Sequence, residues 1–164
     1  NSYLVLGKNK NKLIYAIKKS CEIKSQIVRQ DANEKNLRMI LNFGHTFAHA
    51  IETKNNYSKN INHGEAVLLG MGVATKLSLS RKICSKKTLV EILDIYKKNK
   101  LNYDLKKIFS KINIKNFVDL MKKDKKNNDE KINLILLKKI GTTTIPGRQK
   151  FKSSQIESYL KKII

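Results

Sequence analysis

The sequence predicts a mainly α fold made of several helices, with a small β-hairpin near residues 131–146. In most segments apolar residues recur every three or four positions, which is the spacing of one helix face. Two central segments, residues 38–52 and 63–80, are apolar nearly all round, as buried helices are. Along residues 131–141, KINLILLKKIG, branched apolar side chains alternate as in a strand. The chain has 164 residues, enough to bury a core, and we expect a single domain over residues 1–164.

Further helices are expected on both sides of the central pair. Ser85 is a suitable N-cap for one of them, and the others show apolar residues at helical spacing. Their expected ranges are residues 11–30, 88–99, 104–109, 115–123 and 154–164. The TTTIP segment that follows Gly141 is the expected hairpin partner of the strand.

A stripe of polar residues runs along the first central helix. Its members are spaced by four, three, four and three positions, so they share one face of a continuous helix. They are Arg38, Asn42, His45, His49 and Glu52. Burying such groups without partners costs several kcal/mol, so we expect the stripe to line a cleft that holds an ion or a polar ligand. The alternative is a structural histidine pair bonded to backbone carbonyls.

His45 and His63 suggest a metal site. Imidazole suits zinc and neighbouring divalent metals, and a catalytic site typically has three protein ligands and one open position. The polar, turn-rich segment ETKNNYSKNIN lies between the two histidines and can bring His63 back beside His45. Two histidines alone do not complete such a ligand set.

The run LRMILNFGHTFAHAIE, residues 37–52, followed by HGEAVLLGM from His63, closely resembles the signature of the 3-dehydroquinate synthases. The resemblance extends upstream through CEIKSQIVRQDANEKNLR and downstream to residues 124–126 and INLILLKKIG. Members of this family are NAD-dependent and metal-dependent sugar phosphate cyclases of the shikimate pathway, which leads to chorismate and the aromatic amino acids.

The resemblance implies a C-terminal helical domain that binds metal and substrate, with the family's N-terminal nucleotide-binding α/β domain absent. Consistent with this, no glycine-rich dinucleotide fingerprint follows a strand in the sequence. The implied reaction is a carbon–oxygen lyase reaction that converts 3-deoxy-D-arabino-heptulosonate 7-phosphate to 3-dehydroquinate and phosphate. The implied cofactors are NAD and zinc or cobalt, and the implied full-length enzyme is a homodimer. We expect the chain alone to lack NAD binding, to hold metal weakly and to show no turnover.

The resemblance also implies roles for individual residues. His45 and His63 match the family's two histidine metal ligands, and His49 matches a histidine that relays protons near the phosphate. The other matches are to substrate-binding positions, namely Lys24, Glu34, Arg38, Asn42 and Lys125.

Two features depart from the family pattern. The family's third metal ligand is a glutamate in a segment that precedes the first residue of this sequence, so the ligand set is incomplete here. Ala48 stands where the family commonly has glycine, which adds one methyl group at a close helix contact.

The formal charge of +22 raises nucleic acid or an anionic membrane as a partner. The lysines are scattered among asparagine and isoleucine, however, so we expect an anionic sugar phosphate and neither of those partners. A basic helical nucleic-acid-binding module remains the alternative from a different class, and it predicts strongly salt-dependent binding. Among enzymes, the alternatives are inosose or valiolone type cyclases and, more distantly, metal-dependent polyol dehydrogenases.

The cysteine content and the hydropathy fit a protein of the reducing cytoplasm. Cys21 and Cys84 lie far apart and match no metal-finger or redox spacing, so free thiols are expected. The sequence shows no signal peptide pattern and no apolar run of the length that a membrane span needs.

Overall fold

The computed structural model describes residues 9–54, 61–101, 109, 112–123 and 131–163. Helices dominate, as predicted. They are α2 (Lys10–Gln30), the 3₁₀ helix η1 (Leu37–Asn42), α3 (His45–Lys54), α4 (His63–Ser80), α5 (Lys86–Lys98), α7 (Ile114–Lys122) and α8 (Ser153–Ile163). The strands are β1 (Lys131–Asn133), β2 (Leu137–Lys139), β3 (Thr142–Thr143) and β4 (Lys150–Lys152). The helix predicted over residues 104–109 lies outside the described residues except for Phe109.

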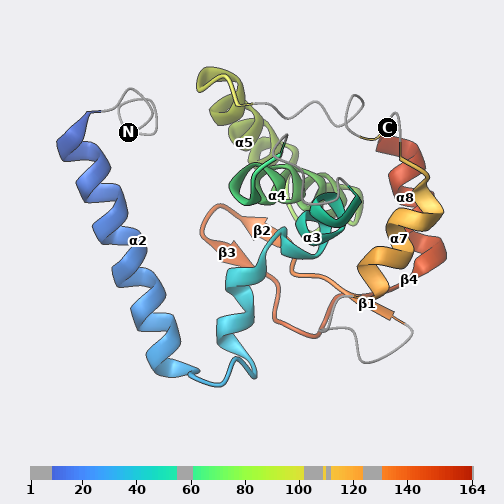
Figure 1. Cartoon of the computed structure of the whole chain (residues 1–164), viewed down its shortest axis with the longest axis horizontal. Coiled ribbons are helices and arrows are strands. Elements are labelled where there is room, and N and C mark those ends of the chain that lie inside the picture. The colour runs from blue at the N-terminus through green and yellow to red at the C-terminus, as the bar shows by residue number, and fades with distance from the viewer. Residues whose placement is uncertain (1–8, 55–60, 102–108, 110–111, 124–130, 164) are drawn as a thin grey trace.

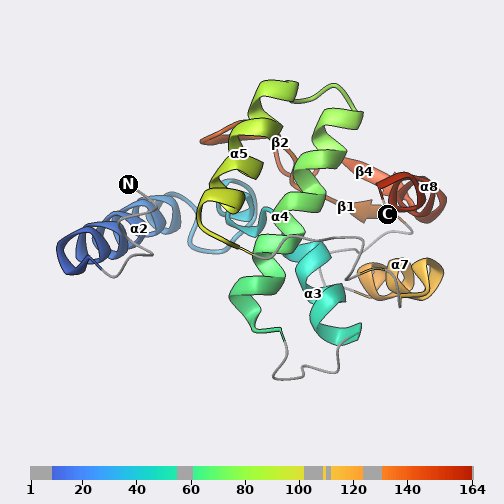
Figure 2. The ribbon, with the colours of Figure 1, turned by 90° about the horizontal axis from the view of Figure 1, so that it is seen from above.

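Helix α4 occupies the middle of the molecule (Figures 1 and 2). Two buried tyrosines and a serine connect α4 to its neighbours. Tyr96 Oη of α5 donates to Leu68 O (3.0 Å), and Tyr159 Oη of α8 donates to Val73 O (3.0 Å). Ser78 Oγ accepts the backbone N–H of Leu137 in β2 (3.0 Å). Burial raises the pKa of Tyr96 to about 12. These hydrogen bonds satisfy polar groups inside the core, where an unpaired one would be costly.

The hydrophobic core lies where α3 and α4 meet α7, α8 and the strands. Phe47 and Ile51 of α3, Val73 of α4, Phe117 of α7 and Leu160 of α8 are each at most 1% exposed. By contrast, α2 has no buried residue and, among the described elements, packs mainly on η1. Both views place α2 on the side of the molecule opposite α7 and α8 (Figures 1 and 2). No helix in the described ranges has the length and apolar character needed to cross a membrane.

The predicted hairpin is confirmed in β2 and β3, which pair antiparallel around Gly141. The single strand predicted over residues 131–141 is wrong, because this stretch forms two strands in two different sheets: β1 pairs with β4 and β2 with β3. The backbone changes partners between them. Leu136 N–H donates to Thr144 Oγ1 (3.1 Å), and Leu137 N–H donates to Ser78 Oγ (3.0 Å). Residues 134–137, between β1 and the start of β2, are all buried, so the apolar run that predicted one strand reflects a buried connection between two.

The continuous helix predicted over residues 38–52 is also wrong. Its first part is the 3₁₀ helix η1, and the chain then turns at Phe43 and Gly44 before α3 begins at His45. Gly44 has a φ of +83°, a conformation that an L side chain rarely adopts and that no α-helix contains. The break redirects the chain while leaving the polar residues on both sides of it close together.

The turn at Gly44 lies directly against Gly70 of α4. A Cβ atom added to Gly70 would come within 2.2 Å of Gly44 O and 3.0 Å of Ala48 N. Added to Gly44, it would lie 2.6 Å from Met71 N. The two backbones are thus in contact with no room for a side chain at either glycine. Ala48, the departure noted above, is fully buried beside this contact.

We expect Gly70→Ala to lower the free energy of unfolding by roughly 2 to 3 kcal/mol, the cost of forcing atoms into a full core. Gly72→Ala in the same helix is the matched control, because its added methyl group would meet nothing closer than Tyr96 Cε2 at 3.7 Å. That variant should keep or slightly raise stability, since alanine favours helix over glycine. Urea unfolding of both variants checks this, and equal midpoints would contradict the close contact.

Candidate functional site

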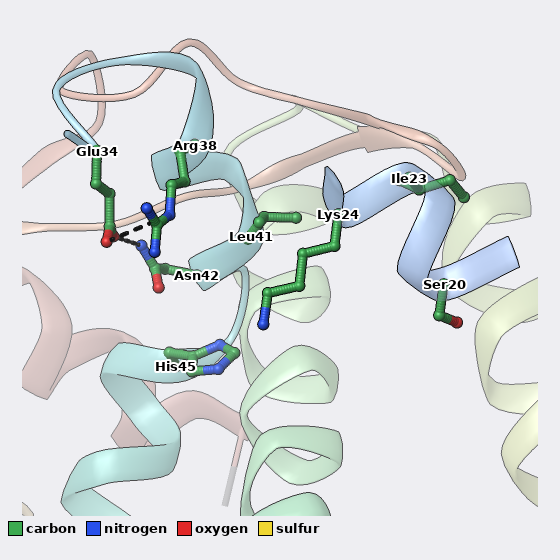
Figure 3. Close-up of a pocket in the computed structure, with 8 residues that line it drawn as sticks. All are labelled: Ser20, Ile23, Lys24, Glu34, Arg38, Leu41, Asn42 and His45. Atoms are coloured by element: carbon green, nitrogen blue, oxygen red, sulfur yellow. Dashed lines mark hydrogen bonds and ion pairs between the residues drawn. The ribbon is translucent and has the colours of Figure 1, made fainter. Parts of the chain in front are cut away.

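A cavity of about 510 Å³ opens between α2, η1 and the first residue of α3. Its lining residues are Ser20, Ile23, Lys24, Glu34, Arg38, Leu41, Asn42 and His45. Figure 3 shows the Lys24 side chain reaching from α2 toward the His45 ring, with Arg38 and Asn42 on the η1 side. Two cationic side chains, a carboxylate, an amide and an imidazole therefore face one space. This chemistry suits a polar ligand with negative charge.

Glu34 connects the polar groups on the η1 side of the cavity. Its Oε1 accepts a hydrogen bond from Asn42 Nδ2 (2.7 Å), and its Oε2 lies 4.0 Å from Arg38 Nε (Figure 3). Arg38 Nη1 also donates to the backbone oxygen of Ala32 (2.7 Å). About a third of each charged side chain is exposed, so water screens this ion pair. The contacts fix the direction of the guanidinium more than they stabilise the fold.

Asp31 holds the turn that precedes η1. Its Oδ1 accepts the backbone N–H of Lys35 (2.9 Å), and its Oδ2 accepts those of Asn36 (2.8 Å) and Arg38 (3.0 Å). These backbone hydrogen bonds, the one from Asn36 foremost, favour the carboxylate form and hold the pKa of Asp31 below its ordinary value. Asp31 is absent from the cavity lining and acts on it through the backbone.

The three histidines lie together beside the cavity. The ring centroid of His45 is 5.8 Å from that of His49 and 5.7 Å from that of His63. A metal bound at 2.0–2.1 Å by two imidazole nitrogens in tetrahedral geometry holds the ring centroids roughly 5 Å apart. His45 and His63 are therefore near enough to share one ion.

The remaining nitrogen of a metal-binding histidine is usually held by a second-layer partner. Here His63 Nδ1 lies 3.0 Å from Glu52 Oε1, a carboxylate that is only 13% exposed. This contact favours the tautomer with the proton on Nδ1 and leaves Nε2 able to bind a cation. The backbone of His63 is fixed as well, because Asn62 and Glu65 form a capping box at the start of α4.

The donor set for a metal is partial. Among the described residues, no group of three or more His, Cys, Asp or Glu side chains is arranged to hold a metal ion. Two neutral imidazoles with a supporting carboxylate fit zinc or cobalt in their chemistry, and they leave positions open for further ligands.

The structure brings most of the predicted site residues together. Five of them line the cavity, and His49 and His63 flank the His45 ring. The five are Lys24, Glu34, Arg38, Asn42 and His45. Lys125 lies outside the described residues. The chemical roles of all the predicted site residues remain predictions.

Sequence reasoning missed three contributions to this region. Ser20 lines the cavity, Asp31 holds the turn before it, and Glu52, which was placed on the polar stripe, pairs with His63. An aspartate just after a helix and before several free backbone N–H groups is a known turn signal, so Asp31 was within reach of sequence analysis. The pairing of Glu52 with His63 depends on tertiary structure.

The model of the family described as 3-dehydroquinate synthase C-terminal matches residues 2–127 of the chain. The chain belongs to this family. The 3-dehydroquinate synthase of Pelagibacter ubique (strain HTCC1062) is 44% identical over 170 aligned positions, which cover 98% of the chain. The 3-dehydroquinate synthase of Thermoanaerobacter pseudethanolicus is 41% identical over 88% of the chain. The chain spans 45% and 39% of the lengths of these two relatives.

Two solved synthase structures share the fold of this chain. A 2-deoxy-scyllo-inosose synthase in complex with carbaglucose-6-phosphate, NAD⁺ and Co²⁺ matches 93% of the chain with a TM-score of 0.74 and 21% identity. The 2-epi-5-epi-valiolone synthase of Streptomyces hygroscopicus subsp. jinggangensis 5008, with NAD⁺ and Zn²⁺ bound, matches 99% with a TM-score of 0.75 and 18% identity. The chain covers 41% and 45% of these two structures.

The stabilising effect of Asp31 should depend on pH. Because its folded-state pKa is lowered from 3.8, its contribution is fully present above the unfolded-state value and is lost as the pH falls through the folded-state value. Asp31→Asn is therefore expected to be less stable than the unmodified chain at pH 7, with a difference that shrinks below about pH 4. Urea unfolding from pH 7 to pH 2 measures this, and a difference independent of pH would contradict it.

Proposed function

We propose that this chain forms the substrate-binding and metal-binding part of a 3-dehydroquinate synthase. Such an enzyme converts 3-deoxy-D-arabino-heptulosonate 7-phosphate to 3-dehydroquinate and phosphate. The observation that carries the proposal is the convergence of Lys24, Arg38, Asn42 and His45 on one cavity, within a chain 44% identical to a curated synthase.

The two cationic side chains of the cavity suit the anionic groups of this substrate. Arg38 offers a planar fork of N–H donors that fits a carboxylate or a phosphate, and Lys24 adds a compact positive charge from the opposite wall. Glu34 and Asn42 hold the guanidinium side of the pocket and supply an acceptor and a donor for substrate hydroxyl groups. Charge thus fixes the ends of the substrate, and hydrogen bonds set its orientation.

The three histidines suit metal binding and proton transfer. We propose that His45 and His63 bind the divalent metal, zinc or cobalt, and that His49 moves a proton near the departing phosphate. The support is the ring separation of 5.7 Å between His45 and His63 and the proximity of His49 to His45. Imidazole takes up and releases protons near neutral pH, which suits His49 to this task.

The two cofactors supply the chemistry that side chains cannot. A divalent metal held by His45 and His63 would polarise the oxygen of the hydroxyl group that is oxidised and of the carbonyl group that results, and bound NAD would accept and return a hydride. The residues of this chain hold the substrate by its charges, orient its hydroxyl groups and move protons. Lys125, by its match to the family motif, is proposed as a further anion-binding lysine.

Metal binding by the chain can be measured directly through the ligand-field absorption of Co²⁺. We expect His45→Ala and His63→Ala each to abolish or greatly weaken Co²⁺ binding, because each removes a ligand. Glu52→Ala should weaken it by about 10- to 100-fold, as loss of a second-layer partner does. His49→Ala is the matched control and should leave the affinity unchanged. Equal affinity of the unmodified chain and His63→Ala would contradict the assignment.

Activity is best tested in a fusion, because the chain spans 45% of the Pelagibacter relative and matches the C-terminal model of its family. The N-terminal part of that relative is joined ahead of this chain and supplied with substrate, NAD and zinc. We expect the fusion to release phosphate and to form 3-dehydroquinate. The chain alone is the comparison, and its expected outcome is no turnover.

Product analysis separates this proposal from its alternatives. A fusion that forms an inosose or a valiolone from the corresponding sugar phosphate would favour a related cyclase instead. A chain that binds duplex or single-stranded nucleic acid, in a manner that salt weakens and that His45→Ala leaves unchanged, would favour a nucleic-acid-binding module.

A further inference from the structure

The turn between α2 and η1 is built around one carboxylate. Asp31 ends α2, where its own backbone N–H donates to Ile27 O (3.1 Å) and Val28 O (3.2 Å). Its side chain then accepts three backbone N–H groups, from Lys35 and Asn36 before η1 and from Arg38 in its first turn, at 2.8 to 3.0 Å. One carboxylate therefore joins the end of the long helix to the start of the next.

Asp31 also does the work of a helix cap for η1. The residue in the N-cap position, Asn36, makes no side-chain hydrogen bond to the helix. The N–H of Arg38, one of the donors that a helix start leaves without an internal partner, is accepted by Asp31 Oδ2 at 3.0 Å. The backbone from which the Arg38 side chain enters the cavity is thus held by Asp31.

The conformation of this turn is unfavourable without support. Glu34 has a φ of +54°, in the left-handed region that costs a residue with a side chain roughly 1 kcal/mol or more. Its N–H donates a long hydrogen bond to Asp31 O (3.3 Å). The three bonds to the Asp31 carboxylate bracket this position and keep the Glu34 side chain directed at Asn42 and Arg38.

We propose that Asp31 is a positioning residue, which fixes Arg38 and Glu34 in the geometry that binds the anionic substrate. This inference rests on the proposed function. A pocket whose charged groups are already in place loses less conformational freedom when the ligand binds. Loss of Asp31 therefore weakens substrate binding while the histidine cluster, which lies on α3 and α4, remains intact.

The test compares Asp31→Asn with Asp119→Asn, an exposed aspartate of α7 on the opposite side of the molecule (Figures 1 and 2). Both variants lose one negative charge. Asparagine at position 31 turns an NH₂ group toward backbone N–H donors, because both carboxylate oxygens are acceptors here. In the fusion we expect Asp31→Asn to raise KM for the substrate about tenfold with kcat within about twofold, and Asp119→Asn to change neither.

Two measurements on the chain itself do not depend on activity. Titration with inorganic phosphate alone should show binding about tenfold weaker for Asp31→Asn than for the unmodified chain, with Co²⁺ affinity unchanged. In hydrogen exchange, the amides of Lys35, Asn36 and Arg38 should be protected in the unmodified chain and lose protection in Asp31→Asn, while those of α4 keep theirs.

The outcomes separate the two proposals. An unmodified fusion that releases no phosphate would overturn the proposed function, whereas the exchange and phosphate measurements would still decide the role of Asp31. An unchanged KM, or a fall in kcat with KM unchanged, would overturn the positioning role. If Asp31→Asn does not fold, exchange in the unmodified chain decides: free-peptide rates at the amides of Lys35, Asn36 and Arg38 overturn the inference, and protection supports it.

Discussion

The contact between the backbones at Gly44 and Gly70 determines the geometry of the rest of the site. Because neither position has room for a side chain, the turn before α3 lies directly on α4, and α3 begins with His45 already beside that helix. His63 lies two helical turns before Gly70, and its ring centroid is therefore 5.7 Å from that of His45. Core packing around Phe47 holds this arrangement on its other side. The histidine cluster is thus a product of helix packing, and the cavity lies beside it, between α2, η1 and His45.

Two carboxylates near the cavity have different tasks because their surroundings differ. Asp31 is satisfied by backbone N–H groups and shapes the turn, whereas Glu34 meets side chains and belongs to the cavity wall. Glu52 forms a third case, since its partner is an imidazole. In a chain with a formal charge of +22, acidic groups are scarce. Of these three, Glu34 contacts a cationic side chain: its Oε2 lies 4.0 Å from Arg38 Nε, which offsets the repulsion between Arg38 and Lys24 across the cavity.

Much of this site was predictable from local spacing, and the failures have identifiable causes. Hydropathy and turn chemistry predict the buried helix that starts at His63, the helix over residues 11–30 and the return of His63 to His45. The helix over residues 38–52 was wrong because the spacing of its polar residues is also satisfied by a 3₁₀ turn followed by a break, and only the contact with Gly70 imposes that break. The change of strand partner after β1 likewise depends on Ser78, which is distant in sequence.

The exposed position of α2, none of whose residues is buried, has a mechanical consequence for the pocket. Lys24 lies about 10 Å along the helix axis from Asp31, seven residues at 1.5 Å each. Rotation of α2 about the Asp31 turn by roughly 10° would carry the Lys24 ammonium group by about 2 Å, the difference between an ion pair and a separated one. The width of the cavity therefore depends on the tilt of α2, whose apolar side chains Ile14 and Ile17 are more than half exposed. Any contact that restrains α2 therefore also sets the distance between Lys24 and the opposite wall of the cavity.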